Sequence, residues 1–225
     1  MFKQINQLFK IARKLASSGA IDTIDEIYKI PTHIKFIFNV ISIGSEKITI
    51  NNSKKPGEKL CDALQEMGTT FIKLGQFLAT RPDIIGEELV DDLVKLQDKL
   101  PAFNINEAKI IIKKELGQAQ FDNIINFSAP IAAASIAQVH IATIDMHGER
   151  KEVAIKILRP NIEKLFNEEL NALMLFAYIV ENTILKSRRL KLVEVVHLLR
   201  EITNIEMDLR FEAAAANELY ENTKN

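Results

Sequence analysis

Lys156 is the residue whose type and setting point most directly to chemistry in this 225-residue chain. It lies in the run Glu152–Leu158, where apolar side chains alternate as they do along a β-strand. A lone lysine on an apolar strand face is costly to bury without an anionic partner. On a bare strand, the usual outcome is a lysine that reaches solvent from an edge. The alternative is a site that binds a negatively charged group.

The residues before this strand favour the binding site. Val139–Ile144 alternates like a second strand, and Asp145–Arg150 is a polar, glycine-containing loop between the two. The small residues Ala132-Ala133-Ala134-Ser135 come before both strands, where a turn from an earlier strand is expected. Lys156 would then lie on the third strand of this region. Val-Ala-Ile-Lys on a third strand, after a small-residue turn, is the kinase arrangement in which the lysine contacts nucleotide phosphates.

The turn carries alanines where a kinase carries glycines. Glycine lets backbone N–H groups approach phosphate closely, because no side chain projects from its Cα. Alanine keeps most of that closeness but disfavours positive φ, so we expect a stiffer loop with a different nucleotide preference. Taken alone, an alanine-rich turn is better explained by tight packing.

A second constellation lies on a predicted helix. Apolar residues from Leu60 to Leu78 recur at three- and four-residue steps, which predicts one long stripe on a helix ended by Arg81-Pro82. Three polar residues share a face beside this stripe, with a glycine among them: Lys73, Gln76, Thr80 and Gly75. A glycine inside a helix costs roughly 1 kcal/mol relative to alanine, so it usually marks close packing or a functional approach.

The last predicted helix, Leu192–Tyr220, carries the acids that these lysines need. Asp208 and Glu212 are four residues apart and share one face, whereas Glu206 lies around the side. From the residues alone, the alternative is an acidic helix surface with arginines nearby.

The other predicted elements are mostly helical. We expect helices over residues 5–15, 89–100, 106–116 and 161–186, and a loop over 186–191. Asn106 is predicted to cap the third of these helices, and Gly117 to end it. Adjacent Asp91 and Asp92 diverge by about 100° around a helix, so we interpret them as exposed, solvated residues rather than metal ligands.

The composition is that of an ordinary globular protein, 47% hydrophobic and 26% charged, with formal net charge −1. This balance gives no general attraction to nucleic acid, and we expect no such partner. A single cysteine, Cys61, excludes an intrachain disulfide and a cysteine-based zinc site, and it fits a reducing compartment. The four histidines have no HExxH-type spacing, so we predict no metal site in the chain.

No segment is predicted to cross a membrane. Met1–Ala20 lacks the continuous apolar core of a signal peptide. The most apolar window, Ile34–Ile43, is interrupted by Lys35 and Asn39 and is too short to span a bilayer. The helix over residues 5–15 is basic and amphipathic, which suits an anionic membrane surface, but packing on the protein body explains it at least as well.

Four motifs now stand in order along the chain. They are FIKLGQFLATRPDII with K-x-G-Q at 73–76, PIAAASIAQVH at 130–140, VAIKILRP at 153–160, and E-x-D at 206–208 followed by RFEAAAANE. Together they resemble the UbiB family of atypical, kinase-like proteins required for ubiquinone biosynthesis. The match covers nearly all of the chain from about residue 58 onward.

The resemblance implies an α+β fold: the N-lobe of a protein-kinase-like domain, with a small antiparallel sheet and an αC-type helix, behind an all-helical N-terminal extension. It implies three parts. The first part, over 1–57, is a helical segment that ends in a linker at Asn51–Gly57. The second is a helical extension with K-x-G-Q over 58–127, and the third is the kinase-like N-lobe over 128–225.

The resemblance also implies roles for individual residues. ATP or ADP, with Mg²⁺, is expected at Lys156, which Glu212 would orient as the αC glutamate. The segment expected to cover the nucleotide consists of Ile131, Ala132, Ala133, Ala134, Ser135, Ile136, Ala137, Gln138 and Val139. The resemblance implies that Lys73 meets the E-x-D carboxylates. The residues implied to gate access to the nucleotide are Lys73, Gly75, Gln76, Glu206 and Asp208.

The catalytic residues of a kinase have no counterpart in these 225 residues, since no HRD-like or DFG-like string occurs. The sequence ends at Asn225, just past the expected αC helix. We therefore assign no catalytic residue and expect the chain alone not to turn over ATP, unless a second chain supplies the missing half. The complete protein would be an ATP-dependent, kinase-like or ATPase factor supporting ubiquinone biosynthesis.

Two alternatives stay open. One is a non-catalytic module that binds a partner or lipid through its amphipathic helices, and the other is a helical scaffold with no nucleotide role. Besides adenine nucleotide, the expected partners are quinone-biosynthesis enzymes, membrane lipid and a second copy of the chain. The expected location is peripheral, at the cytoplasmic side of the inner membrane, with the cytoplasm as the alternative.

Overall fold

The structure is a computed structural model that describes residues 2–18, 21–22, 25, 30–41, 43, 54–96, 100–146, 148–183 and 185–224. The chain divides into two units. The helical unit comprises residues 1–97 and 164–203, and the sheet unit comprises residues 98–163 and 204–225. Residues 51–53 of the predicted linker lie outside the described residues.

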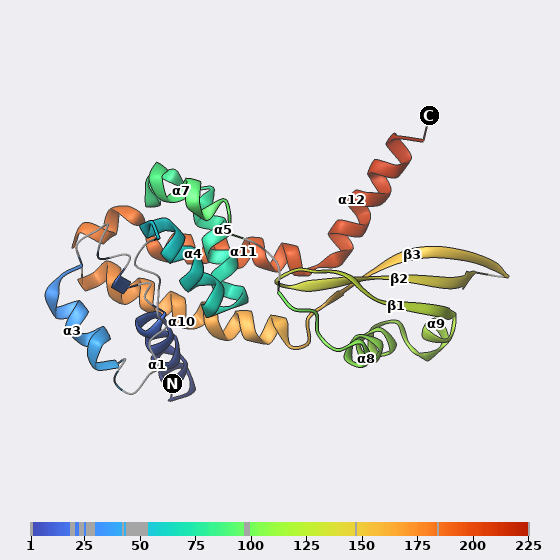
Figure 1. The fold of residues 1–225 in the computed structure, drawn as a ribbon, viewed down its shortest axis with the longest axis horizontal. Helices are drawn as coiled ribbons and strands as arrows, with labels where there is room; N and C mark the ends of the chain where they lie inside the picture. Colours follow the sequence, from blue (N-terminus) through green and yellow to red (C-terminus); the bar gives the residue numbers. More distant parts are fainter. Residues whose placement is uncertain are drawn as a thin grey trace. The chain divides into compact units, whose positions relative to one another are not determined.

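The helical unit holds the N-terminal helices and most of two later ones (Figure 1). Its helices are α1 (Phe2–Ser17), α3 (Thr32–Ile41), α4 (Pro56–Met67), α5 (Thr69–Ala79), α6 (Pro82–Ile85) and α7 (Glu87–Leu93). They are followed by most of α10 (Ile162–Thr183), the 3₁₀ helix η1 (Leu185–Leu190) and most of α11 (Leu192–Met207). Within the described residues, none of these helices has both the length and the apolar character to span a bilayer.

The long helix predicted up to Arg81 is in fact two helices, α4 and α5, which separate at Gly68. Gly68 has φ +94°, a backbone conformation that side chains disfavour. Its N–H donates to the carbonyl of Gln65 at 3.0 Å, which closes α4. The apolar spacing continues across this break, so the periodicity alone did not reveal it.

Asp92 corrects another prediction, because its side chain is buried rather than exposed. It lies against the start of α4, where a Cβ on Gly57 would come within 2.3 Å of Asp92 Oδ2. Lys95 Nζ pairs with Asp92 Oδ1 at 3.0 Å and balances the carboxylate. Asp91 is exposed, as predicted. Within the helical unit, glycine at position 57 therefore makes room for a carboxylate.

The sheet unit contains one antiparallel sheet and its flanking helices. Its strands, paired in the order β1-β2-β3, are β1 (Ile124–Ala133), β2 (Ala137–Met146) and β3 (Glu149–Leu158). Its helices are α8 (Ile105–Leu116), α9 (Gln118–Asp122), the ends of α10 and α11, and α12 (Leu209–Asn222). The predicted α+β class, with a small antiparallel sheet among helices, is confirmed.

Two element boundaries in the sheet unit differ from the prediction. Asn104, not Asn106, caps α8, since its side-chain oxygen accepts the N–H of Asn106 at 2.8 Å. The last helix is divided at Asp208 into α11 and α12, so Asp208 and Glu212 do not share one continuous helix. In the helical unit, the predicted loop over 186–191 is largely the 3₁₀ helix η1.

One face of the sheet packs on α8 and forms the core of this unit. The core cluster contains Ala108 and Ile112 of α8 and Ile157 of β3. Partly buried apolar residues surround it: Phe103, Ile111, Phe121, Ile124, Phe127 and Ile155. Since strand residues alternate between faces, Lys156 is directed away from this core.

Cys61 of α4 provides a test of the helical packing. Burial, with a contribution from the Asp92 carboxylate, raises the pKa of the Cys61 thiol from 9.0 to about 11. The Cys61 Sγ also donates to the Asp92 carbonyl at 3.2 Å. At pH 8 we therefore expect about a hundredfold less thiolate than in the unfolded chain, and correspondingly slow reaction with Ellman's reagent. The rate should keep rising tenfold per pH unit beyond pH 9, whereas in urea it should level off near pH 9. A plateau near pH 9 in the folded chain would contradict this packing.

Gly75 of α5 provides a second test. A Cβ at this position would lie 2.6 Å from Leu96 Cδ2 and 2.8 Å from Leu64 Cδ1, both in a buried environment. Overpacking of this kind costs about 1–3 kcal/mol, whereas alanine improves helix propensity by about 1 kcal/mol. We expect Gly75→Ala to lower the free energy of unfolding by about 1 kcal/mol in urea titration. Gln76→Ala, one residue along, should change it by less than about 0.5 kcal/mol. A stabilised Gly75→Ala variant would show that the helices do not approach this closely.

Candidate functional site

The structure brings Lys156 and Glu212 together within the sheet unit. Lys156 Nζ lies 2.5 Å from Glu212 Oε2, although 56 residues separate them in the sequence. The Lys156 side chain is 35% exposed and that of Glu212 is 59% exposed. Exposed ion pairs contribute little to stability, so the main consequence of this pair is the orientation of the lysine.

The register of the sheet determines what surrounds Lys156. Lys156 pairs with Val139 across β2 and β3, and Ala154 pairs with Ile141. Directly paired residues lie on the same face of a sheet, so these four residues share the face opposite the core. Ile141 is 37% exposed. A small, partly apolar platform thus lies beside the ammonium group.

Glu212 is positioned by the break between α11 and α12. Asp208 caps α12, because its Oδ1 accepts the N–H of Arg210 at 3.1 Å. The same carboxylate makes a two-pronged pair with the Arg210 guanidinium, with N–O distances of 2.7 and 2.6 Å. These hydrogen bonds hold the pKa of Asp208 below its usual range. The cap starts a new helix whose first turn carries Glu212.

The alanine-rich turn connects β1 to β2 beside this pair. The N–H of Ala134 donates to the carbonyl of Ala137 at 2.8 Å, which closes the turn. Its first residues are exposed or half-buried, with Ile131 59% exposed. The residues that follow are buried: Ser135, Ile136, Ala137 and Gln138. None of the turn residues has a positive φ, which agrees with alanine in place of glycine.

The side chain of Gln138 lies on the core face, opposite Lys156. Its Oε1 accepts the N–H of Phe103 at 2.9 Å, and its Nε2 lies 3.3 Å from the Phe103 carbonyl and 2.9 Å from His140 Nε2. His140 Nδ1 is 2.9 Å from the Ser128 carbonyl. A neutral His140 with its proton on Nδ1 satisfies every bond in this network. Any role of Gln138 in binding a nucleotide must therefore pass through its backbone.

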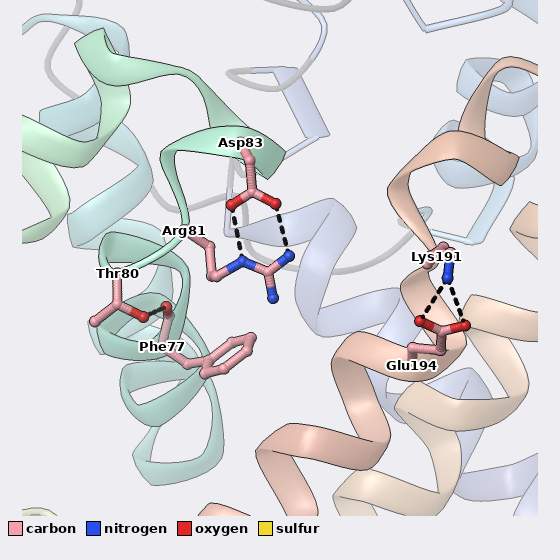
Figure 2. A network of polar contacts seen from close by, with 6 residues as sticks. All are labelled: Phe77, Thr80, Arg81, Asp83, Lys191 and Glu194. Atoms are coloured by element: carbon pink, nitrogen blue, oxygen red, sulfur yellow. Dashed lines mark hydrogen bonds and ion pairs between the residues drawn. The ribbon is translucent and has the colours of Figure 1, made fainter.

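The residues of the K-x-G-Q motif lie in the helical unit, on α5. Gly75 is buried, and Lys73 and Gln76 are half-buried. Figure 2 shows how α5 ends: the Thr80 hydroxyl donates to the Phe77 carbonyl at 2.7 Å.

Just beyond α5, Arg81 makes a two-pronged pair with Asp83, with N–O distances of 2.8 and 2.6 Å. Arg81 occupies the N-cap position of the following short helix, α6, but its side chain makes no capping hydrogen bond. The other two predicted gating residues, Glu206 and Asp208, belong to the sheet unit.

Sequence reasoning missed two parts of the site in the sheet unit. Arg159, in the Arg-Pro that follows β3, donates hydrogen bonds to the turn carbonyl of Ala134. The buried Gln138–His140 network was also missed, since hydrophobicity patterns do not predict polar partners. The Leu-Arg-Pro string after Val-Ala-Ile-Lys was the available signal for Arg159.

The arrangement suits an anionic ligand. An ammonium group stands beside a turn of small residues and an apolar platform, which is the donor set of a phosphate and base site. Across the described part of the chain, no three His, Cys, Asp or Glu residues gather in a way that could hold a metal ion by themselves.

Residues 95–225, more than half of the chain, match the family described as the ABC1 atypical kinase-like domain. A probable protein kinase UbiB of Marinobacter nauticus is 34% identical over 223 residues, which cover 99% of this chain and 40% of that protein. The corresponding protein of Azotobacter vinelandii is 40% identical, over 71% of this chain and 29% of its own length. That of Shewanella loihica is 38% identical, over 76% of this chain and 31% of its own length. The chain thus spans well under half the length of these relatives. It belongs to the ABC1 family of atypical kinase-like proteins, among the relatives of UbiB.

Proposed function

We propose that the sheet unit binds an adenine nucleotide, with Lys156 on its α- and β-phosphates and Glu212 holding the lysine in place. The observation that carries this proposal is the Lys156–Glu212 ion pair, 2.5 Å long, beside the alanine-rich turn. A kinase needs the same lysine–glutamate pair, from its third strand and αC helix, to hold ATP. The complete protein would then be an ATP-dependent, kinase-like or ATPase factor that supports ubiquinone biosynthesis.

The residues present fit a nucleotide better than a bare metal ion. Lys156 provides positive charge for phosphate, and the exposed side chain of Ile141 and its neighbour Ala154 offer an apolar surface for a base. Mg²⁺ binds oxygen ligands and is commonly carried by the phosphates themselves, where it would neutralise their charge. We assign no catalytic residue to this chain.

The gating role of the K-x-G-Q residues is part of the same proposal. Lys73, Gly75 and Gln76 would restrain access to the nucleotide through the carboxylates of Glu206 and Asp208. The Asp208 carboxylate already pairs with Arg210, so a lysine must compete with that guanidinium.

Non-catalytic partner binding is the second candidate function, and α12 supports it. No residue of α12 is buried. Three large apolar residues on this helix are 59–64% exposed: Phe211, Leu219 and Tyr220. We propose three further partners: quinone-biosynthesis enzymes, membrane lipid at the cytoplasmic side of the inner membrane, and a second copy of the chain.

The test is a titration of the 225-residue chain with fluorescent ADP and Mg²⁺. Lys156→Ala should raise the dissociation constant at least tenfold, because a hydrogen bond to a charged group is worth about 1.5–3 kcal/mol. Glu212→Gln should weaken binding less, since it removes the orientation of the lysine but not its charge.

The matched control is Lys151→Ala, at an exposed position near the other end of β3, which should bind within about twofold of wild type. No saturable binding by the wild type, or equal binding by Lys156→Ala, would reject the nucleotide proposal and leave partner binding as the function.

A further inference from the structure

Arg159 joins three separate segments of the sheet unit. Its Nε and Nη2 donate to the carbonyl of Ala134 in the alanine-rich turn, at 3.0 and 2.8 Å. Its Nη2 also donates to the carbonyl of Pro101 at 3.0 Å and lies 3.4 Å from that of Leu100. The backbone N–H of Arg159 donates to the carbonyl of Ile136 at 2.8 Å. The residue that follows β3 thus holds both the turn and the segment before α8.

These bonds fix the direction of one peptide group in the turn. In a trans peptide, the C=O and the N–H point in opposite directions. Because the Ala134 carbonyl is held by the guanidinium, the N–H of Ser135 must point away from Arg159. Turn N–H groups are the donors that bind phosphate, so their direction decides which oxygens they can meet.

The segment Leu100–Phe103 is itself held at a second point. Gln138, at the start of β2, accepts the N–H of Phe103 at 2.9 Å, and its amide nitrogen lies 3.3 Å from the Phe103 carbonyl. Phe103 also packs on the core cluster of the sheet unit. A strap of four residues, 100–103, is therefore anchored on the sheet and serves as a fixed point for Arg159.

We propose that Arg159 is a positioning residue that, with the strap 100–103, sets the orientation of the alanine-rich turn before any ligand binds. The consequence for phosphate recognition rests on the proposed nucleotide function. The effect of Arg159 on the orientation of the turn does not depend on that function.

The planar fork of arginine reaches the carbonyls of the turn and of the strap at once, whereas lysine offers a single nitrogen. In Arg159→Lys, we expect amide hydrogen exchange of Ala134, whose N–H closes the turn, to speed up at least tenfold, with exchange unchanged in the middle of β2 and β3. Arg150→Lys, at an exposed position on β3, is the matched control and should leave the turn unchanged. Unaltered exchange of the turn in Arg159→Lys would overturn the proposal.

The wild-type chain gives a second measurement that needs no variant. Without nucleotide, the Ala134 amide should exchange as slowly as the strand amides of β2. Fast exchange, as in an open turn, would overturn the proposal even if Arg159→Lys failed to fold.

Fluorescent ADP then separates the two claims. If the wild type binds, Arg159→Lys should raise the dissociation constant about fivefold or more while Arg150→Lys does not, and an unchanged constant would overturn the link to phosphate. If the wild type does not bind, the nucleotide function fails, and the exchange experiment alone decides the role of Arg159.

Discussion

The ion pair between Lys156 and Glu212 is the interaction on which the rest of the candidate site depends. Lys156 lies among apolar residues in the second half of β3, and Glu212 supplies an anionic partner from a distant helix. The pair is too exposed to hold the unit together by its own energy. Its geometry is instead imposed by two other features, the register of β3 against β2 and the cap that begins α12.

One face of the sheet packs in the core of the unit, and the other carries the candidate site. On the core face, Gln138 and His140 satisfy each other and the backbone of the neighbouring segments, and Phe127 stacks on the His140 ring with centroids 4.3 Å apart. A buried polar network of this kind is stable only when every member is paired. Because these bonds are complete on one face, the other face can present Lys156 without disturbing the fold.

Local pattern predicted much of this arrangement, and its failures have physical causes. The alternation in β3 places Lys156 opposite the core, as the sequence indicated, because a strand has a strict period of two. The breaks at Gly68 and Asp208 were missed because the apolar spacing runs on through both positions, and only the caps reveal them. The burial of Asp92 was missed because its side chain packs against Gly57, which belongs to another helix, α4. Side-chain partners of this kind depend on tertiary contacts that no local period encodes.

Replacing glycine by alanine changes how the turn meets a ligand. A glycine-rich loop is mobile, so ordering it costs free energy when a ligand binds. Here the turn closes without positive φ, and the guanidinium of Arg159 holds one of its carbonyls. The ordering cost is then met during folding, which favours a ligand of matching shape and penalises one that needs the loop to move. The turn of alanines and the arginine that holds it are therefore two parts of one constraint: both would limit the proposed nucleotide to the geometry that the sheet unit already provides.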